Sequence, residues 1–305
     1  MRKIEWTYIP ITILILILIF VIFIYYYIKR LKNYLKIQIK KLCNQNDKIK
    51  VFNPILPFKD KNFDKSNALS LYYINKAVSD WSGCKDPLPE PPENFKLIKT
   101  FQCYDSYSDK NRNMIVMYKS DILNMMIISF SGTKYLSEWV DDADFRQISP
   151  NFYNDSKILI HRGFYSMYNS TRDDLFNTIK NNITENTLII LTGHSLGGCL
   201  AAISYVDILK NLQSLPFYST IKSYLYTFGS PRVGNNDFAN FINNNNDKDF
   251  FVSYRVANTE DVIPIAILPV IGEYIYEHYN NLVYFTINLK DNNLNHGESY
   301  IKFLS

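Results

Sequence analysis

The stretch Ile189-Ile190-Leu191-Thr192-Gly193-His194-Ser195-Leu196-Gly197-Gly198-Cys199-Leu200 decides the fold that this sequence predicts. An apolar run leads into Gly-His-Ser-Leu-Gly, and small apolar residues follow it. This G-x-S-x-G pattern is typical of a sharp turn from a strand into a helix that presents a serine. Glycines are needed there because the strained serine backbone and the close approach of strand and helix leave no room for side chains. The pattern predicts that Ser195 is a nucleophile at a helix N-terminus, where backbone N–H groups favour a developing negative charge.

The basic charge of the chain is concentrated at its N-terminus. The 305 residues carry a net charge of +4, and 47% of them are hydrophobic. Residues 1–50 contain ten Lys/Arg against two acids, a net charge of +8, which leaves −4 on the rest. A nucleic-acid-binding domain needs its positive patch on the folded part of the chain. We therefore expect no nucleic-acid partner.

Residues Trp6 to Ile28 form an apolar run without a charged side chain. A helix over this run, at about 1.5 Å per residue, is long enough to cross a hydrocarbon core of about 30 Å. A signal peptide would have a shorter apolar part and small residues at a cleavage site, whereas this run ends in Tyr-Tyr-Tyr-Ile-Lys-Arg. We expect a single transmembrane anchor in residues 1–30, followed in residues 31–64 by a basic juxtamembrane segment and linker that faces anionic lipid.

The side of the membrane that the folded part occupies stays open. The lysines and arginines that follow the apolar run outnumber Arg2 and Lys3 before it, which favours a cytosolic domain under the positive-inside rule. A disulfide between Cys84 and Cys103 would instead require an oxidising compartment. Four reduced thiols are the alternative.

Short apolar segments alternate with longer segments of helical period in residues 65–305. Strands are expected over residues 114–118, 125–130, 187–191, 224–228 and 251–256, and helices over 67–82, 166–179, 201–212 and 237–242. Such alternation is typical of an α/β domain with a largely parallel sheet. The run Asn243 to Asn246 is expected to be a polar surface loop.

The histidines offer two candidates for a catalytic base. A serine hydroxyl is a weak nucleophile until a base takes its proton and a third group orients that base. In hydrolases with this turn, the acid and then the histidine follow the serine along the chain. His161 precedes Ser195, and His194 is its neighbour, so its side chain points elsewhere. His278 and His296 remain.

Asp261 is the best candidate for the acid. The strand expected over residues 251–256 delivers it into a loop that Pro264 closes. Ligands of open parallel sheets bind at such carboxyl ends of strands, so we expect a catalytic carboxylate there. Glu260 and Asp207 are the alternatives, and Asp207 is expected to be a solvated charge on a helix face.

Several ordered motifs resemble those of the class 3 lipases, the fungal triacylglycerol lipase-like family. They are Gly193–Gly198, Tyr226–Gly234 and Asn258–Pro264, with shorter matches at Ser129–Thr133 with Trp139 and Asp142, and at His161–Phe164 with Tyr168. The resemblance covers about residues 65–305. It implies an α/β-hydrolase fold with a mostly parallel central sheet. It also implies a triad of Ser195, Asp261 and His296, and it matches His278 to a non-catalytic position.

The loop after residue 130 is expected to help stabilise an oxyanion. The backbone N–H of Leu196, the residue after the serine, is one expected donor. The resemblance places the family's other donor on Thr133. The chain departs from the family at Ser131, where an arginine is common, and this departure concerns the support of the loop. Residues 134–142 fall where such lipases carry a lid, and packing on the body is the alternative for them.

The sequence predicts a membrane-anchored carboxylic ester hydrolase of the lipase type that needs no metal or organic cofactor. The lipid ester would be attacked by Ser195 to give an acyl-enzyme. A catalytically inactive membrane-tethered binding protein and an acyltransferase with the same triad are the alternatives. The apolar segment Ile263 to Ile275 is expected either to line an acyl pocket or to be core. Acyl-chain preference, head-group preference and oligomeric state stay open.

Overall fold

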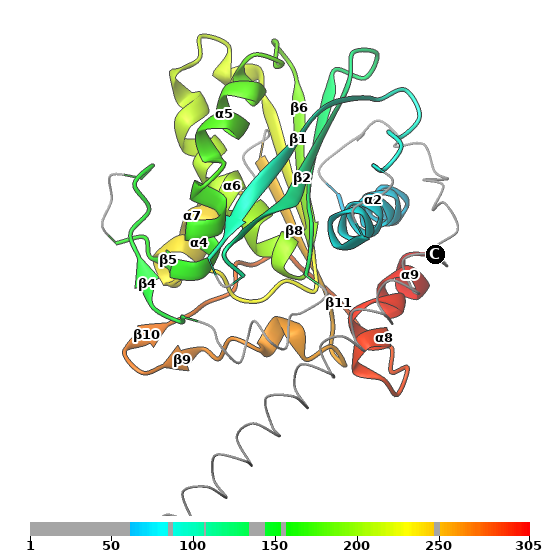
Figure 1. The fold of residues 1–305 in the computed structure, drawn as a ribbon, viewed down its shortest axis with the longest axis vertical. Coiled ribbons are helices and arrows are strands. Elements are labelled where there is room, and N and C mark those ends of the chain that lie inside the picture. The colour runs from blue at the N-terminus through cyan, green and yellow to red at the C-terminus, as the bar shows by residue number, and fades with distance from the viewer. Residues whose placement is uncertain (1–61, 85–87, 107, 134–143, 154–156, 247–250) are drawn as a thin grey trace, which may run out of the picture. The chain divides into compact units, whose positions relative to one another are not determined.

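Seven strands form the main sheet, in the order β1-β2-β3-β6-β7-β8-β11 (Figure 1). The structure is a computed structural model and describes residues 62–84, 88–106, 108–133, 144–153, 157–246 and 251–305. The first three strands pair antiparallel, and every pair from β3 to β11 is parallel. The mostly parallel α/β sheet expected from the alternating pattern is therefore confirmed.

The main sheet consists of β1 (Lys96–Asp105), β2 (Lys110–Ser120), β3 (Met125–Phe130), β6 (Leu188–His194), β7 (Lys222–Phe228), β8 (Phe251–Asn258) and β11 (Leu282–Phe285). The helices are α2 (Lys65–Cys84), α4 (Arg162–Asn169), α5 (Arg172–Lys180), α6 (Leu196–Asn211), α7 (Asn236–Asn245), α8 (Asn292–His296) and α9 (Glu298–Leu304). Two small sheets pair β4 (Gln147–Ile148) with β5 (Ile160–His161) and β9 (Val270–Ile271) with β10 (Tyr274–Ile275). Three short 3₁₀ turns are η1 (Leu212–Ser214), η2 (Tyr218–Thr220) and η3 (Ile263–Ile265).

Helices cover both faces of the sheet, which explains its continuous apolar strands. Alternate side chains of a strand point to opposite faces. Ile115 and Met117 of β2 join the buried cluster of α4, α5, α6 and α7, whereas Val116 and Tyr118 join the cluster of α2 and α9. All six residues of β3 are buried, as in a sheet that is covered on both sides.

The strand register brings four strand ends to one edge of the sheet. Phe130 of β3 pairs with Gly193 of β6, and His194 pairs with Phe228 of β7. Because β3, β6, β7 and β8 run parallel, the segments that follow them leave the sheet at the same edge. In open parallel sheets this edge is where ligands bind.

Two predictions of secondary structure were wrong, and both concern polar segments. The helix expected over residues 166–179 is two helices, α4 and α5, which meet at Ser170 and Thr171. The run expected to be a loop from Asn243 onward instead completes α7. Asparagine groups satisfy the last turn of that helix: the Asn245 amide donates to the Phe241 carbonyl at 2.8 Å, and the Asn246 N–H donates to the Ile242 carbonyl.

The expected transmembrane and juxtamembrane segments, through residue 61, and the possible lid at residues 134–142, which includes Trp139 and Asp142, lie outside the described residues. Within the described ranges, no helix is both long and apolar enough to cross a membrane. Cys103 is a buried free thiol, and burial raises its pKa to about 12. The reduced alternative therefore holds for Cys103.

Candidate active site

Ser195 occupies the turn between β6 and α6 in a strained backbone conformation. Its φ of 61° and ψ of −129° are rare for a residue with a side chain and cost about 1–3 kcal/mol. The Ser195 N–H donates to the Phe228 carbonyl at 2.9 Å, which ties the turn to β7. Within the described part of the chain, its buried Oγ has no hydrogen-bond partner. The described part of the protein therefore leaves the Ser195 hydroxyl available to react with a substrate.

The flanking glycines are required by close approach. A Cβ on Gly197 would lie 2.1 Å from the Phe130 carbonyl oxygen, and one on Gly193 would lie 2.1 Å from the Gly197 carbonyl oxygen. Neither neighbouring segment can easily move away, because β3 is paired with β6 and the first turn of α6 is buried. The G-x-S-x-G spacing therefore packs α6 directly onto the strands.

Asp261 and His296 are joined by a hydrogen bond. His296 Nδ1 donates to Asp261 Oδ2 at 2.8 Å. Because the carboxylate accepts, the proton lies on Nδ1 and Nε2 is left as the basic nitrogen. The Asp261 side chain is fully buried, whereas 18% of the His296 side chain is exposed. The buried carboxylate of Asp261 thus orients the partly exposed imidazole of His296, which is the base.

Two further donors satisfy the buried Asp261 carboxylate. The Tyr300 hydroxyl donates to Oδ2 at 2.7 Å, and the Ile263 N–H donates to Oδ1 at 3.0 Å. Burial, and then the negative charge of Asp261, raise the pKa of Tyr300 well above its usual value, so the hydroxyl remains a donor. A buried charge is tolerated when it is paired and hydrogen-bonded in this way. Sequence reasoning assigned no role to Tyr300, although it lies only four residues after His296.

Gly229 provides the space for the Asp261–His296 pair. Its φ is +56°, and a Cβ there would lie 3.0 Å from both Asp261 Oδ2 and His296 Cε1, and 2.9 Å from the Tyr300 hydroxyl. A side chain would therefore be strained and would also collide with the pair. The signal for this role is the glycine that directly follows Phe228, the last residue of a buried strand.

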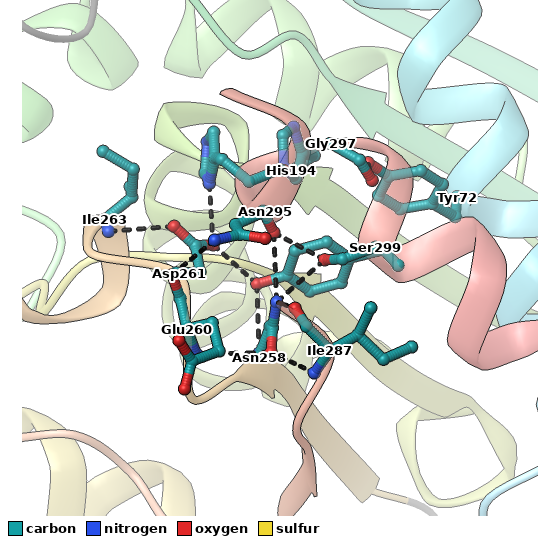
Figure 2. Close-up of polar contacts among 12 residues, drawn as sticks. Tyr72, His194, Asn258, Glu260, Asp261, Ile263, Ile287, Asn295, Gly297 and Ser299 are labelled. Atoms are coloured by element: carbon teal, nitrogen blue, oxygen red, sulfur yellow. Dashed lines mark hydrogen bonds and ion pairs between the residues drawn. The ribbon is translucent and has the colours of Figure 1, made fainter. Parts of the chain in front are cut away.

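Asn258 connects the loop of the acid to the loop of the base (Figure 2). Its amide nitrogen donates to the Ile287 carbonyl at 2.8 Å and to Ser299 Oγ at 3.0 Å, and its oxygen accepts from the Ile287 N–H at 3.1 Å. Asn295 adds a hydrogen bond from its amide to the Glu260 carbonyl at 3.3 Å. These contacts fix α8 and α9 against the end of β8. A polar residue at the end of a fully buried strand is the signal that could have identified Asn258.

His194 supports the backbone around His296. Its Nε2 donates to the His296 carbonyl at 2.6 Å, and the two rings lie 4.3 Å apart. The Tyr72 hydroxyl of α2 donates to the neighbouring Gly297 carbonyl at 2.8 Å. Burial, followed by the proximity of His296, lowers the pKa of His194 well below its usual value. His194 is therefore a neutral donor at physiological pH.

The other two histidines have different partners. His278 Nε2 donates to the Pro264 carbonyl at 3.0 Å, and burial with nearby Arg255 and Arg232 lowers its pKa to about 3. His161 Nδ1 accepts from the N–H groups of two residues in the first turn of α4 and so caps that helix. Burial lowers its pKa to about 4. Of the two candidate bases, the structure brings His296 to Asp261.

The predicted oxyanion donors flank the serine turn. Leu196 is the first residue of α6, so its N–H has no partner within the helix. Thr133 follows Gly132, whose N–H donates to Ser79 Oγ of α2 at 2.9 Å. A Cβ on Gly132 would lie 3.5 Å from Ser195 Cβ. Ser131 contributes to this loop by donating from Oγ to the Gly132 carbonyl at 2.8 Å, so the loop is held without the arginine that is common in the family.

The two alternative acids, Glu260 and Asp207, form hydrogen bonds with residues outside the predicted triad. Glu260 Oε2 accepts from the Asn288 amide at 2.8 Å. Asp207 lies in α6 but is fully buried, with Arg172 Nε at 2.7 Å and the Tyr168 hydroxyl at 2.6 Å from its Oδ2. The expectation of a solvated charge at Asp207 was wrong, because the apolar surroundings of that helix include one arginine placed to pair with it.

Comparisons with known proteins agree with this arrangement. The family model of the class 3 lipases matches residues 127–270. A lipase of Rhizomucor miehei is 28% identical over 207 residues, which cover 63% of this chain and 52% of that protein. Phospholipase A1-II 1 of Oryza sativa subsp. indica is 31% identical over 160 residues, which cover 46% of this chain and 38% of that protein. The chain thus spans about half or less of these relatives' length.

Solved structures show the same fold. A triacylglycerol lipase from Penicillium expansum has a TM-score of 0.57 with this chain at 20% identity, covering 73% of this chain and 81% of that one. The likeness at this identity concerns the arrangement of strands and helices. It confirms the α/β-hydrolase fold expected from the motifs.

Proposed function

We propose that this chain, which belongs to the class 3 lipase family, is a serine hydrolase that cleaves carboxylic esters of lipids. The observation that carries the proposal is the Asp261–His296 pair beside a strained serine whose buried Oγ has no partner among the described residues. A nucleophile after β6, an orienting acid after β8 and a base at the end of α8 form the usual arrangement for acyl transfer.

The proposed reaction uses the five residues expected from the sequence. Ser195 Oγ attacks the ester carbonyl, and its proton passes to Nε2 of His296, whose orientation Asp261 holds. The N–H groups of Leu196 and Thr133 stabilise the oxyanion. His296 then gives the proton to the departing alkoxide, which leaves as an alcohol, and water hydrolyses the acyl-enzyme by the same route.

We also infer that the enzyme works beside a membrane. The support is the uncharged run Trp6 to Ile28 and the basic residues that follow it, which suit a single-pass anchor and a segment facing anionic lipid. Residues 65–305 would then be the catalytic domain, joined through residues 31–64. Protease protection of the full chain in vesicles tests this topology.

The activity is tested with the full chain on a panel of carboxylic esters. Fatty acid release is expected from the unmodified protein, and Ser195→Ala is expected to lower kcat by about 10³-fold or more. Ser214→Ala, at an exposed serine in η1, is the matched control and should retain full activity. A folded wild-type protein that releases no fatty acid would support the inactive binding protein. Transfer of the acyl group to an added alcohol in preference to water would support the acyltransferase.

A further inference from the structure

One face of α2 carries three polar residues, Tyr72, Asn75 and Ser79, at spacings of three and four residues. Side chains at these spacings lie on the same face of a helix. The Tyr72 hydroxyl donates to the Gly297 carbonyl at 2.8 Å, directly after the predicted base. The other two side chains contact the strands and the loop around the predicted nucleophile. This face of α2 therefore reaches several parts of the site at once.

Asn75 fixes α2 to the strands that lead to the nucleophile and to the oxyanion donors. Its amide nitrogen donates to Thr192 Oγ1 of β6 at 2.9 Å, and its amide oxygen accepts from Ser129 Oγ of β3 at 2.8 Å. All three residues are fully buried. Buried polar groups are costly to leave without partners, so these hydrogen bonds are not easily broken. The helix thus has a defined position relative to the ends of β3 and β6.

Ser79 lies one turn further along α2 and contacts the segment that follows β3. We call this segment, residues 131–133, the oxyanion loop. The Gly132 N–H donates to Ser79 Oγ at 2.9 Å, and no other partner of this N–H lies among the described residues. Ser79 is half-buried. Its hydroxyl therefore holds the residue directly before Thr133, the proposed oxyanion donor.

Gly132 packs into the corner between α2 and the turn of the nucleophile. A Cβ on this glycine would lie 2.9 Å from the His194 carbonyl oxygen, 3.5 Å from Ser195 Cβ and 3.6 Å from Ser79 Oγ. The first of these distances is too short for a real side chain, so a larger residue would push the oxyanion loop away from the serine. The position of this loop beside Ser195 is thus set by close contacts on the side of α2.

The oxyanion loop needs such an external contact because glycine has the freest backbone of all residues. An oxyanion donor acts only when it lies about 2.7–3.1 Å from the position of the developing charge. The direction of the Thr133 N–H follows from the orientation of the peptide that joins it to Gly132. The hydrogen bond to Ser79 Oγ selects one backbone orientation of Gly132, and with it one direction for the donor.

We propose that Ser79 is a positioning residue for the oxyanion loop. By accepting from the Gly132 N–H, its hydroxyl directs the Thr133 N–H toward the oxyanion that forms when Ser195 attacks an ester. The proposal rests on the proposed hydrolase function and on Thr133 as a donor. Ser79 does not touch the reacting atoms and transfers no proton. Its loss is therefore expected to lower kcat and to leave the protonation of His296 unchanged.

The experiment measures hydrolysis of 4-nitrophenyl hexanoate by the full chain, per active site counted by fluorophosphonate labelling to completion. Ser79→Ala is expected to lower kcat about tenfold, less than the 10²–10³-fold cost of removing an oxyanion donor itself. KM should change less than about twofold, because the contact acts on the transition state. The pH midpoint of kcat/KM, which reports the base, should stay at the wild-type value.

Two further variants separate the hydroxyl of Ser79 from a general effect on the helix. Ser79→Thr keeps the accepting oxygen, so kcat is expected to return to within about threefold of the wild-type value. Ser70→Ala is the matched control. This serine is fully buried in α2, and its hydroxyl donates to the Ser66 carbonyl of the same helix at 3.1 Å. Its kcat should equal that of the wild type.

Each outcome decides between the alternatives. A loss of kcat in Ser79→Ala that Ser79→Thr restores supports the proposal. An unchanged kcat in Ser79→Ala overturns it, and so does an equal loss in both variants or in Ser70→Ala. A shifted pH midpoint also overturns it, because the change would then act through His296. A folded wild-type protein that neither cleaves the ester nor takes the label refutes the hydrolase function itself.

Discussion

Two buried aspartates in this molecule have nearly the same surroundings and different consequences. The side chains of Asp261 and Asp207 are both 0% exposed, and each accepts from a tyrosine hydroxyl, Tyr300 at 2.7 Å and Tyr168 at 2.6 Å. The basic partners are also alike in exposure, at 18% for His296 and 17% for Arg172. The difference lies in the chemistry of the partner and the place of the pair in the fold.

The partner decides what each carboxylate can do. Arg172 donates two hydrogen bonds to Asp207, from Nε at 2.7 Å and from Nη2 at 2.9 Å. Its guanidinium group stays charged at every accessible pH. This pair can only stabilise the packing of α5 on α6. His296 uses one nitrogen for Asp261 and keeps a second one that can accept a proton. The same buried carboxylate therefore orients a base where the fold places it at a strand end.

The largest effect expected from this comparison is on activity at Asp261. Asp261→Asn places an amide opposite Nδ1, and the amide can donate to that nitrogen and so favour the wrong tautomer of His296. In a serine triad this change lowers kcat by about 10⁴-fold. Ester hydrolysis per folded molecule measures the loss, with circular dichroism to show that the fold remains. Activity within tenfold of wild type would remove Asp261 from the triad.

The matching change at Asp207 is expected to act on stability. Asp207→Asn removes the buried counter-charge of Arg172 and leaves only the exposed Asp173 carboxylate beside it, which lowers the free energy of unfolding by about 3–5 kcal/mol. Urea titration measures this loss. At temperatures where the variant is folded, kcat should equal the wild-type value. A loss of kcat without a loss of stability would mean that Asp207, not Asp261, supports the reaction.

Substitution of the two tyrosines is expected to change stability and kcat less than substitution of the aspartates. Each Tyr→Phe change removes one buried donor to a carboxylate and costs about 1–3 kcal/mol. Tyr168→Phe should show this cost in the free energy of unfolding alone. Tyr300→Phe should also lower kcat, by about tenfold, because Asp261 loses a contact that holds it against His296. Equal kcat values for the two variants would show that Tyr300 has no positioning role.

The last effect, which develops only as the pH falls, concerns acid stability near the Asp207 pair. His161 caps α4, the helix of Tyr168, and its pKa is about 4 when folded, against about 6.5 when unfolded. The unfolded state therefore binds the proton first, so stability is lost as the pH falls from about 6.5 toward 4, by at most about 1.4 kcal/mol per pH unit.

His161→Asn tests this contribution because it keeps an acceptor at the cap and removes the titrating group. Unfolding free energies between pH 7 and 4 should fall less steeply in the variant than in the wild type. His278, whose pKa is about 3, and His194, whose pKa burial also lowers, remain in both proteins and contribute to the residual slope. An unchanged slope would show that His161 does not control the acid sensitivity.

The same comparison shows what the sequence could predict. The turn at Ser195 has a local signal, since glycine spacing and apolar periodicity reflect backbone constraints within a few residues. His296 was identified by chain order together with the family resemblance. The burial of Asp207 has no local signal, because its partner Arg172 is 35 residues away. The roles of Tyr300 and Asn258 likewise depend on contacts across 39 and 29 or more residues, and tertiary packing alone creates them.

The most direct test of the central claim is the site and rate of covalent labelling by a fluorophosphonate. Intact-mass and peptide analysis should find one adduct, on Ser195, in the wild type. The labelling rate should be unchanged in folded Asp207→Asn and lowered by orders of magnitude in Asp261→Asn. A folded wild-type protein that takes no label on Ser195, or that labels equally fast in both variants, would contradict the account.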